Sequence, residues 1–152
     1  MQPMYNLVKR QAETELLPLA EAEQMAVIPY NPLGAGLLSG KYDTYSKPDH
    51  GRLVDREMYS KRYSLPHYYE IAQRFTAFAK EQNTHPATLA VAWVMSHPAI
   101  TAPILGARNV SQLDASLAAV DIKMTDELRE RIAALSIPPP PATDRLEEQI
   151  HD

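Results

Sequence analysis

The spacing of hydrophobic residues and the signals at helix starts predict five helices along the chain. Between residues 66 and 83, Ile71, Phe75 and Phe78 recur at i, i+4 and i+7, which places them on one helical face. Apolar residues also cluster on one face in 9–24 and lie at helical spacing in 86–96, and 125–135 is amphipathic. The predicted helices cover residues 9–24, 66–83, 86–96, 109–119 and 125–135.

Capping residues and prolines indicate where several of these helices begin. Thr84, Asn109 and Thr125 precede helical patterns and are good N-cap residue types. Pro86 suits a first helical turn, where its missing N–H costs nothing. Pro18 lies inside the first predicted helix, so that helix either kinks there or begins close to it.

Residues 25–30 form a short apolar run without alternation, which predicts a strand buried on both faces, as in a parallel sheet. Residues 99–105 form a second short apolar run and predict another strand. A possible strand stub covers residues 2–4. Strands that alternate with helices predict an α/β fold made of βα units. Residues 43–65 are polar and lack a period, which predicts a long surface loop. The prolines after 136 predict a linker and a polar C-terminal tail over 136–152.

Composition narrows the class of protein. The 152 residues are 45% hydrophobic and 22% charged, a globular balance. The net charge of −4 argues against nucleic-acid binding through bulk positive charge. The chain has no cysteine, which excludes disulfides and thiolate metal sites and fits a cytoplasmic protein. No membrane segment, signal peptide or metal motif is expected from the apolar runs and the N-terminal sequence.

The first candidate for chemistry is the sequence YNPLGAGLLSGK at residues 30–41. It follows a predicted buried strand, and α/β folds bind ligands at the carboxyl ends of strands. Its glycines allow backbone amides to approach an anion, Lys41 adds charge, and Tyr30 offers a ring for stacking. The alternative is a structural turn with packed leucines, because a lone G-x-G is weak evidence.

The second candidate is the sequence PILGARNVSQ at residues 103–112. A strand ends at Gly106, Arg108 follows, and a helix begins near Asn109. Amides at a helix N-terminus beside an arginine form a generic anion site. The alternative is that Asn109 only caps the helix and Arg108 is solvated.

Taken together, these motifs resemble the C-terminal part of the aldo-keto reductase superfamily. The matching pieces are the QPMYN sequence from Gln2, the stretch from Val27 to Tyr42, the pair Ala92–Trp93 and the stretch from Pro103 to Leu113, in the family's order and spacing. The bacterial and potassium-channel-β-subunit-like branch is the most similar. The resemblance implies a partial (β/α)8 barrel over residues 1–135, made of a clipped sixth strand, the seventh and the eighth with their helices.

The resemblance also implies an NADP (NADPH) cofactor and a role for each matching residue. Gln2 would bind the nicotinamide carboxamide and Tyr30 would stack on the nicotinamide ring. Arg108 would lie near the adenosine 2′-phosphate. The remaining cofactor-binding residues would line the pyrophosphate or flank the adenine end: Asn31, Pro32, Leu33, Gly34, Gly36, Lys41, Gly106, Ser111 and Gln112.

The chain departs from the family's pattern in two ways. Ala115 and Ser116 stand where the family often has a Glu-Asn pair on the adenine. The family's catalytic Asp, Tyr, Lys and His lie on its first four strands, and nothing here matches them, so no catalytic residue is assigned. Barrels of this kind need about 250 residues, whereas this sequence has 152.

Three interpretations follow. The chain is part of an NADPH-dependent oxidoreductase and is inactive alone, because the half with the catalytic residues is absent. Alternatively, it is a non-catalytic half-barrel that binds nucleotide, self-associates or pairs with a chain carrying the missing half. A third possibility is a structural remnant without a ligand. No nucleic-acid or membrane partner is expected, and the sequence does not identify the substrate.

Overall fold

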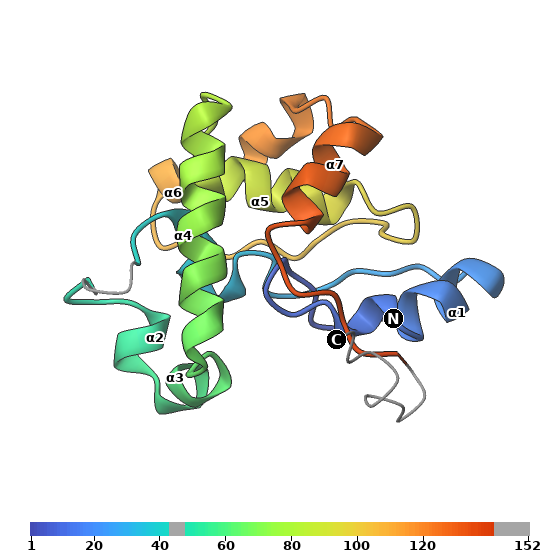
Figure 1. Cartoon of the computed structure of the whole chain (residues 1–152), viewed down its shortest axis with the longest axis horizontal. Helices are drawn as coiled ribbons and strands as arrows, with labels where there is room; N and C mark the ends of the chain where they lie inside the picture. The colour runs from blue at the N-terminus through green and yellow to red at the C-terminus, as the bar shows by residue number, and fades with distance from the viewer. Residues whose placement is uncertain (43–47, 142–152) are drawn as a thin grey trace, which may run out of the picture.

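The computed structural model describes residues 1–42 and 48–141, and these consist of short helices joined by extended segments (Figure 1). The predicted polar tail beyond residue 141 lies outside the described residues. The α-helices are α1 (Leu16–Ala22), α2 (Arg52–Asp55), α3 (Glu57–Arg62), α4 (Pro66–Glu81), α5 (Pro86–Met95), α6 (Val110–Leu117) and α7 (Asp126–Ala133). The 3-10 helices are η1 (Gln11–Glu13), η2 (Gly34–Ser39) and η3 (Ala118–Asp121).

Four of the five predicted helices are confirmed as α4, α5, α6 and α7, within a few residues of the expected bounds. The prediction of one continuous helix over 9–24 is wrong, because this stretch forms η1 and then α1. The alternative, that the helix begins close to Pro18, is confirmed. Pro18 is the third residue of α1, where no intrahelical N–H is required, so the α-helix begins just before the proline.

Two of the three predicted caps are confirmed. The side chain of Asn109 accepts a hydrogen bond from the Gln112 amide (2.9 Å), and Thr125 accepts one from the Leu128 amide (3.2 Å). The prediction for Thr84 is wrong, because His85 Nδ1 accepts the hydrogen bond from the amide of residue 87 instead (3.1 Å). Pro86 is the first residue of α5, as expected.

Part of the predicted loop over 43–65, residues 43–47, lies outside the described residues. In the rest the prediction is partly wrong, because α2 and α3 occupy much of residues 48–65. Leu53 and Tyr63 are buried and anchor these helices to the core. Helices of four and six residues carry too few apolar positions to produce a recognisable period.

The two predicted strands do not form a regular sheet in the part of the chain that the structure describes. Segments 1–5, 26–30 and 101–104 run extended and side by side, with parallel bridges only at Met4–Tyr30 and Tyr30–Ile104. Each segment contains a proline, which has no N–H to donate to a ladder. The partial barrel implied by the family resemblance is therefore not confirmed by the secondary structure.

The central segment 26–30 is buried on one face only. Val27 and Pro29 are buried, whereas Ala26 and Ile28 are exposed. The helices α5, α6 and α7 lie together on one side of the extended segments (Figure 1). The prediction that this segment is buried on both faces is wrong for the described chain, because no element covers the side chains on its second face.

A polar network around Trp93 joins the N-terminal segment to the helices. The ring of Trp93 is fully buried, and the Arg129 guanidinium lies 4.9 Å from its centroid. The same guanidinium donates to the Trp93 carbonyl (2.7 Å) and to the Tyr5 hydroxyl (3.2 Å). The Tyr5 hydroxyl donates in turn to Glu13 (2.6 Å). Burial and then the Glu13 carboxylate raise the pKa of Tyr5, so this hydroxyl stays protonated.

The last helix closes the core over the N-terminal turn. Arg10 donates to the Ala133 carbonyl (3.2 Å), and the Ser136 hydroxyl donates to the Leu7 carbonyl. Ile132 is fully buried in the main hydrophobic cluster. These contacts join residues more than 120 positions apart, so the register of the N-terminal segment depends on α7.

We expect Ile132→Ala to lower the free energy of unfolding by about 2–5 kcal/mol, because it leaves a cavity in the packed core. The matched control is Ile137→Ala, whose side chain is 57% exposed and which should change stability by less than about 0.5 kcal/mol. Urea denaturation followed by far-UV circular dichroism measures both. Equal losses for the two variants would contradict the packing of α7 described above.

Candidate functional site

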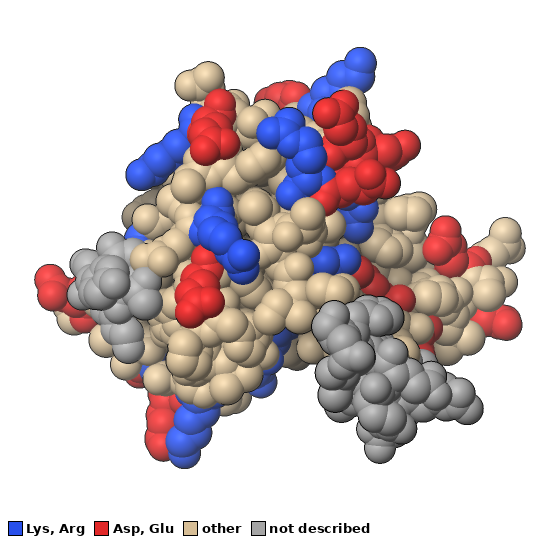
Figure 2. All heavy atoms as spheres, in the orientation of Figure 1, with Lys and Arg blue, Asp and Glu red and all other residues tan. Residues whose placement is uncertain are grey.

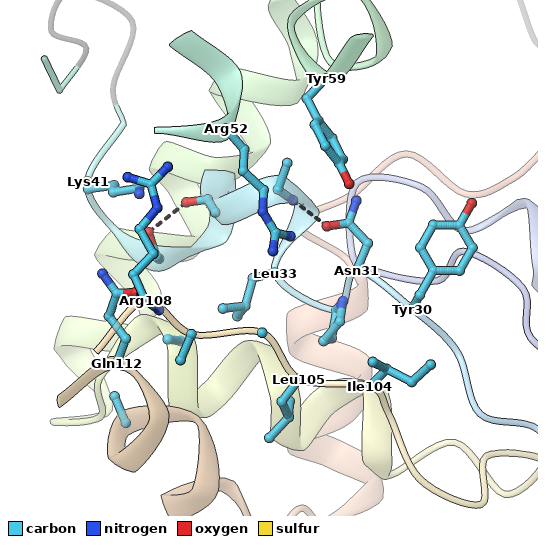
Figure 3. A pocket seen from close by; sticks show the side chains of 18 of the residues that line it. Tyr30, Asn31, Leu33, Lys41, Arg52, Tyr59, Ile104, Leu105, Arg108 and Gln112 are labelled. Atoms are coloured by element: carbon cyan, nitrogen blue, oxygen red, sulfur yellow. Dashed lines mark hydrogen bonds between the residues drawn. The ribbon is translucent and has the colours of Figure 1, made fainter. Parts of the chain in front are cut away.

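A cavity of about 530 Å³ opens where the central and outer extended segments end (Figure 3). Its walls come from η2, from α2 and α3, and from the loop that leads into α6. Tyr30 lies at one end of the pocket, and Arg108 with Gln112 lies at the other. Ligand pockets in proteins commonly have volumes of 300–1,000 Å³.

The turn after Tyr30 depends on residues that tolerate left-handed backbone angles. Asn31 has φ 64° and Gly36 has φ 94°. The side-chain oxygen of Asn31 accepts a hydrogen bond from the Ala35 amide (2.7 Å), which closes the turn. Even Ala35 is held at φ 59°, so the surrounding packing imposes this conformation.

The buried Tyr63 hydroxyl holds this turn from below. It accepts hydrogen bonds from the amide groups of Asn31 (2.6 Å) and Asn6 (3.1 Å). It also lies 3.5 Å from the Met4 sulfur, the geometry of a weak donated bond. Burial raises the pKa of Tyr63, so the hydroxyl remains neutral and keeps its proton. The side chain of Asn31 is therefore occupied in positioning the backbone of the turn.

Three cations and one carboxylate lie around the other end of the pocket. Lys41, Arg52 and Arg108 line it, and Asp55 accepts a hydrogen bond from the Arg108 guanidinium at the long distance of 3.5 Å. Desolvation, followed by the charges of Arg108 and Arg52, lowers the pKa of Lys41. An anion placed here would relieve this repulsion.

Two glycines allow the cations to lie against the backbone. A Cβ atom on Gly36 would come 3.2 Å from Lys41 Cε, and one on Gly106 would come 3.1 Å from an Arg52 guanidinium nitrogen. At either position, the Cβ atom of any other residue would lie unusually close to the Lys41 or Arg52 side chain. The glycines at these two positions therefore let the Lys41 and Arg52 side chains lie close to the backbone.

The first turn of α6 adds hydrogen-bond donors to the same end of the pocket. Gln112 Oε1 accepts a hydrogen bond from the Arg108 amide (3.1 Å) and fixes the loop before the helix. Within residues 1–42 and 48–141, no hydrogen bond involves the amides of Val110 or Ser111. Free amides at a helix N-terminus beside an arginine suit a phosphate group.

The structure brings ten of the twelve predicted site residues to this pocket and leaves two outside it. Gln2 is exposed on the first extended segment, and Gly34 is buried beneath the turn. Their roles as cofactor ligands remain predictions. The ten that line the pocket are Tyr30, Asn31, Pro32, Leu33, Gly36, Lys41, Gly106, Arg108, Ser111 and Gln112.

The sequence analysis missed several residues that line the pocket. Arg52 and Tyr59 come from the stretch interpreted as a loop, and the Arg52 guanidinium lies 5.7 Å from the Tyr59 ring centroid. No motif signals them, since only the packing of α2 and α3 brings them to the site. His85 also lines the pocket, and no motif signals this residue either.

The two positions that depart from the family's pattern differ in their surroundings. Ala115 lines the pocket and offers no polar side chain there. Ser116 is buried, and its hydroxyl donates to the Gln112 carbonyl (3.1 Å) within α6. Neither side chain therefore adds a hydrogen bond toward the cavity.

Other classes of site receive no support among residues 1–42 and 48–141. No group of three or more histidine, aspartate or glutamate side chains there could hold a metal ion. No helix in the same residues has the length and hydropathy needed to cross a bilayer. On the face drawn in Figure 2, cationic and anionic side chains are interspersed, without a broad field of either sign.

The model of the Aldo/keto reductase family matches residues 1–137 of the chain. The Bacillus subtilis protein named "Uncharacterized oxidoreductase YrpG" is 35% identical over 128 residues, which are 84% of this chain and 37% of that protein. A "Probable voltage-gated potassium channel subunit beta" of Arabidopsis thaliana is 31% identical over 134 residues, covering 80% of this chain and 38% of the relative.

A solved structure, that of the glycerol dehydrogenase AKR11B4 from Gluconobacter oxydans, superposes with a TM-score of 0.69 and 26% identity. The match covers 88% of this chain and 41% of the dehydrogenase. The chain therefore spans less than half the length of the relatives and of the solved structure that it matches.

We expect Tyr63→Phe to destabilise the chain by about 1–3 kcal/mol, because it removes the acceptor of one hydrogen bond from the buried Asn6 amide and one from the half-buried Asn31 amide. Tyr59→Phe is the matched control, since no hydrogen bond involves the Tyr59 hydroxyl in the described residues, and its effect should stay below about 0.5 kcal/mol. Thermal unfolding by differential scanning calorimetry gives both values. A neutral Tyr63→Phe would show that this hydroxyl does not hold the turn.

Proposed function

Because the chain belongs to the aldo/keto reductase family, we propose that it is the cofactor-binding part of an NADPH-dependent carbonyl reductase, with its three extended segments arranged as part of a (β/α)8 barrel. The observation that carries this proposal is the joint placement of Lys41, Arg52 and Arg108 beside free main-chain amides in one pocket. Its relatives include proteins named as oxidoreductases.

The residues of the pocket fit a dinucleotide with a phosphate-rich middle and two ring-containing ends. Lys41 and Arg52 lie against Gly36 and Gly106, so cationic groups and backbone reach the same space and would hold the pyrophosphate. Arg108 is 56% exposed at the outer end, where it would reach a 2′-phosphate. The amides at the start of α6 would add donors to that phosphate.

The opposite end of the pocket fits a nicotinamide ring. Tyr30 provides a flat aromatic surface there. Met4 and Tyr30 are partners in a parallel bridge, so Gln2, two residues before Met4, has its side chain on the same face as Tyr30. Gln2 would then hold the carboxamide while Tyr30 orients the ring. A bound NADPH supplies the hydride for carbonyl reduction, and these residues bind and orient it.

The chain by itself does not contain the family's proton-donating residues, so we propose that it binds the cofactor without turnover. The substrate pocket of the whole enzyme, and therefore its substrate, depends on parts of the family's fold that this chain does not match. We also propose a cytoplasmic location, which agrees with the absence of cysteine.

Titration with NADPH, followed by the change in nucleotide fluorescence, tests the binding function. We expect Arg108→Ala to weaken NADPH binding about 10–100-fold, because a charge-assisted contact to phosphate contributes about 1.5–3 kcal/mol. NADH lacks the 2′-phosphate and should lose less than about 3-fold. The matched control is Arg131→Ala, which removes a guanidinium of α7 that lies over the Phe78 ring of α4. This variant should leave both affinities unchanged.

Equal losses for NADPH and NADH in the Arg108 variant would contradict the assignment of the 2′-phosphate site. No binding at millimolar NADPH by the folded wild-type chain would overturn the binding function altogether and favour a structural remnant without a ligand.

We expect the isolated chain to show no carbonyl-dependent oxidation of NADPH above the background without protein. A panel of aliphatic and aromatic aldehydes and ketones, with absorbance at 340 nm as the readout, measures this. The control is the same assay without a carbonyl compound. Turnover that scales with chain concentration and disappears in Arg108→Ala would show that the chain carries catalytic groups of its own.

A further inference from the structure

We propose that Lys41 is a covalent modification site, at which the side-chain amine condenses with small aldehydes that carry a phosphate group. Lys41 follows η2 and lines the pocket described above. The inference goes beyond the proposed function, because it needs only the amine, the pocket and the cations around it. It therefore stands whether or not the pocket binds NADPH.

The Lys41 amine is accessible and lies against three neighbours. Lys41 is among the exposed residues, and its Nζ atom lies 5.2 Å from the centroid of the Tyr42 ring. A Cβ atom on Gly36 would come 3.5 Å from Nζ, and one on Gly51 would come 3.6 Å from it. The aromatic ring and two glycine backbones therefore restrain the amine at the pocket wall, where a small molecule can reach it.

The amine has no carboxylate partner within residues 1–42 and 48–141. The ion pairs there do not include Lys41, and Asp55 accepts hydrogen bonds from the Arg108 guanidinium and from the Gly51 amide (3.0 Å). Desolvation and then the charges of Arg108 and Arg52 lower the pKa of Lys41. A larger share of this amine is therefore neutral at pH 7 than of an ordinary lysine. Only the neutral amine has the lone pair that attacks a carbonyl carbon.

Two arginines beside the amine select aldehydes with an anionic group. Arg52 and Arg108 line the same pocket as Lys41. A guanidinium ion keeps its charge at physiological pH and forms paired hydrogen bonds with phosphate oxygens. A phosphate held there brings an aldehyde on the same small molecule close to the amine, and such proximity speeds bond formation. The cavity of about 530 Å³ has room for a ring and a phosphate group.

The condensation needs no oxidant or reductant. The amine lone pair forms a bond to the carbonyl carbon, and the carbonyl oxygen becomes the hydroxyl group of a carbinolamine. Loss of this hydroxyl group leaves a C=N bond. The water that departs carries the aldehyde oxygen and the two hydrogens of the neutral amine. The product is an imine that fills part of the pocket, so the modification would also exclude other anionic ligands from this space.

Other lysines of the described chain lack this combination of neighbours. Lys61 forms an ion pair with a carboxylate of its own helix (2.7 Å), and the Lys9 amine donates to the Tyr68 hydroxyl (3.0 Å). Lys80 is exposed in the last turn of α4 and does not line the pocket. It serves as the matched reference, because its amine is accessible without cations placed to hold a phosphate.

The test uses the complete chain without nucleotide and pyridoxal 5′-phosphate as the probe. Borohydride reduces each imine to a stable secondary amine, and mass spectrometry of proteolytic peptides gives the extent of modification at each lysine. We expect Lys41 to react at least about 10-fold faster than Lys80, because the pocket concentrates the probe beside the amine. Pyridoxal has the same aldehyde without the phosphate. It should react with Lys41 at least about 10-fold more slowly than its phosphate does, and with Lys80 at a similar rate.

Two pairs of variants identify the groups involved. Lys41→Arg keeps the positive charge but removes the nucleophilic amine, so the pocket adduct should disappear, whereas Lys80→Arg should leave it unchanged. Arg108→Gln should slow the reaction of Lys41 with pyridoxal 5′-phosphate at least about 3-fold and leave its reaction with pyridoxal unchanged. Far-UV circular dichroism verifies that the variants are folded. Peptide mapping of the unaltered chain needs no variant and gives an answer by itself.

Three results would overturn the proposal. One is equal modification of Lys41 and Lys80 by pyridoxal 5′-phosphate. Another is an equal rate at Lys41 for pyridoxal and its phosphate, which would remove the role of the arginines. The third is modification of Lys41 that excess inorganic pyrophosphate does not slow. Loss of NADPH binding alone would contradict the proposed function and leave the Lys41 assignment intact, since no nucleotide enters this experiment.

Discussion

The whole architecture depends on the alignment of three extended segments at Tyr30. This residue is a bridge partner of Met4 on one side and of Ile104 on the other. Backbone hydrogen bonds support the alignment on both sides of the central segment, although prolines at 3, 29 and 103 remove one donor from each segment. Packing of the helices reinforces these hydrogen bonds. α5 supplies this packing, since every residue from Ala87 to Val94 is buried.

The Tyr63 hydroxyl links the alignment of these segments to the position of the candidate site. Tyr63 receives hydrogen bonds from Asn6, beyond the first segment, and from Asn31, beyond the central one. Asn31 then closes the turn by accepting from the Ala35 amide. A shift of either segment would thus move the backbone that faces the pocket. Tyr63 is a positioning residue, because its hydroxyl is buried beneath the turn and away from the cavity.

The sequence predicted well what depends on local pattern. The helices α4 and α7 follow from apolar periodicity, and the N-caps Asn109 and Thr125 follow from their short polar side chains at helix starts. The extended segments were recognised, but apolarity does not reveal how many hydrogen bonds form or which face remains open. Ten of the residues that the motifs predicted for the site line one pocket. Arg52 and Tyr59 could not be predicted, since their place depends on tertiary packing of two short helices.

Ligand binding is physically connected to these segments. Tyr30 and Ile104 belong to the aligned segments and also line the pocket, together with residues that follow each of them. A ligand that binds only the aligned state therefore favours that state by mass action.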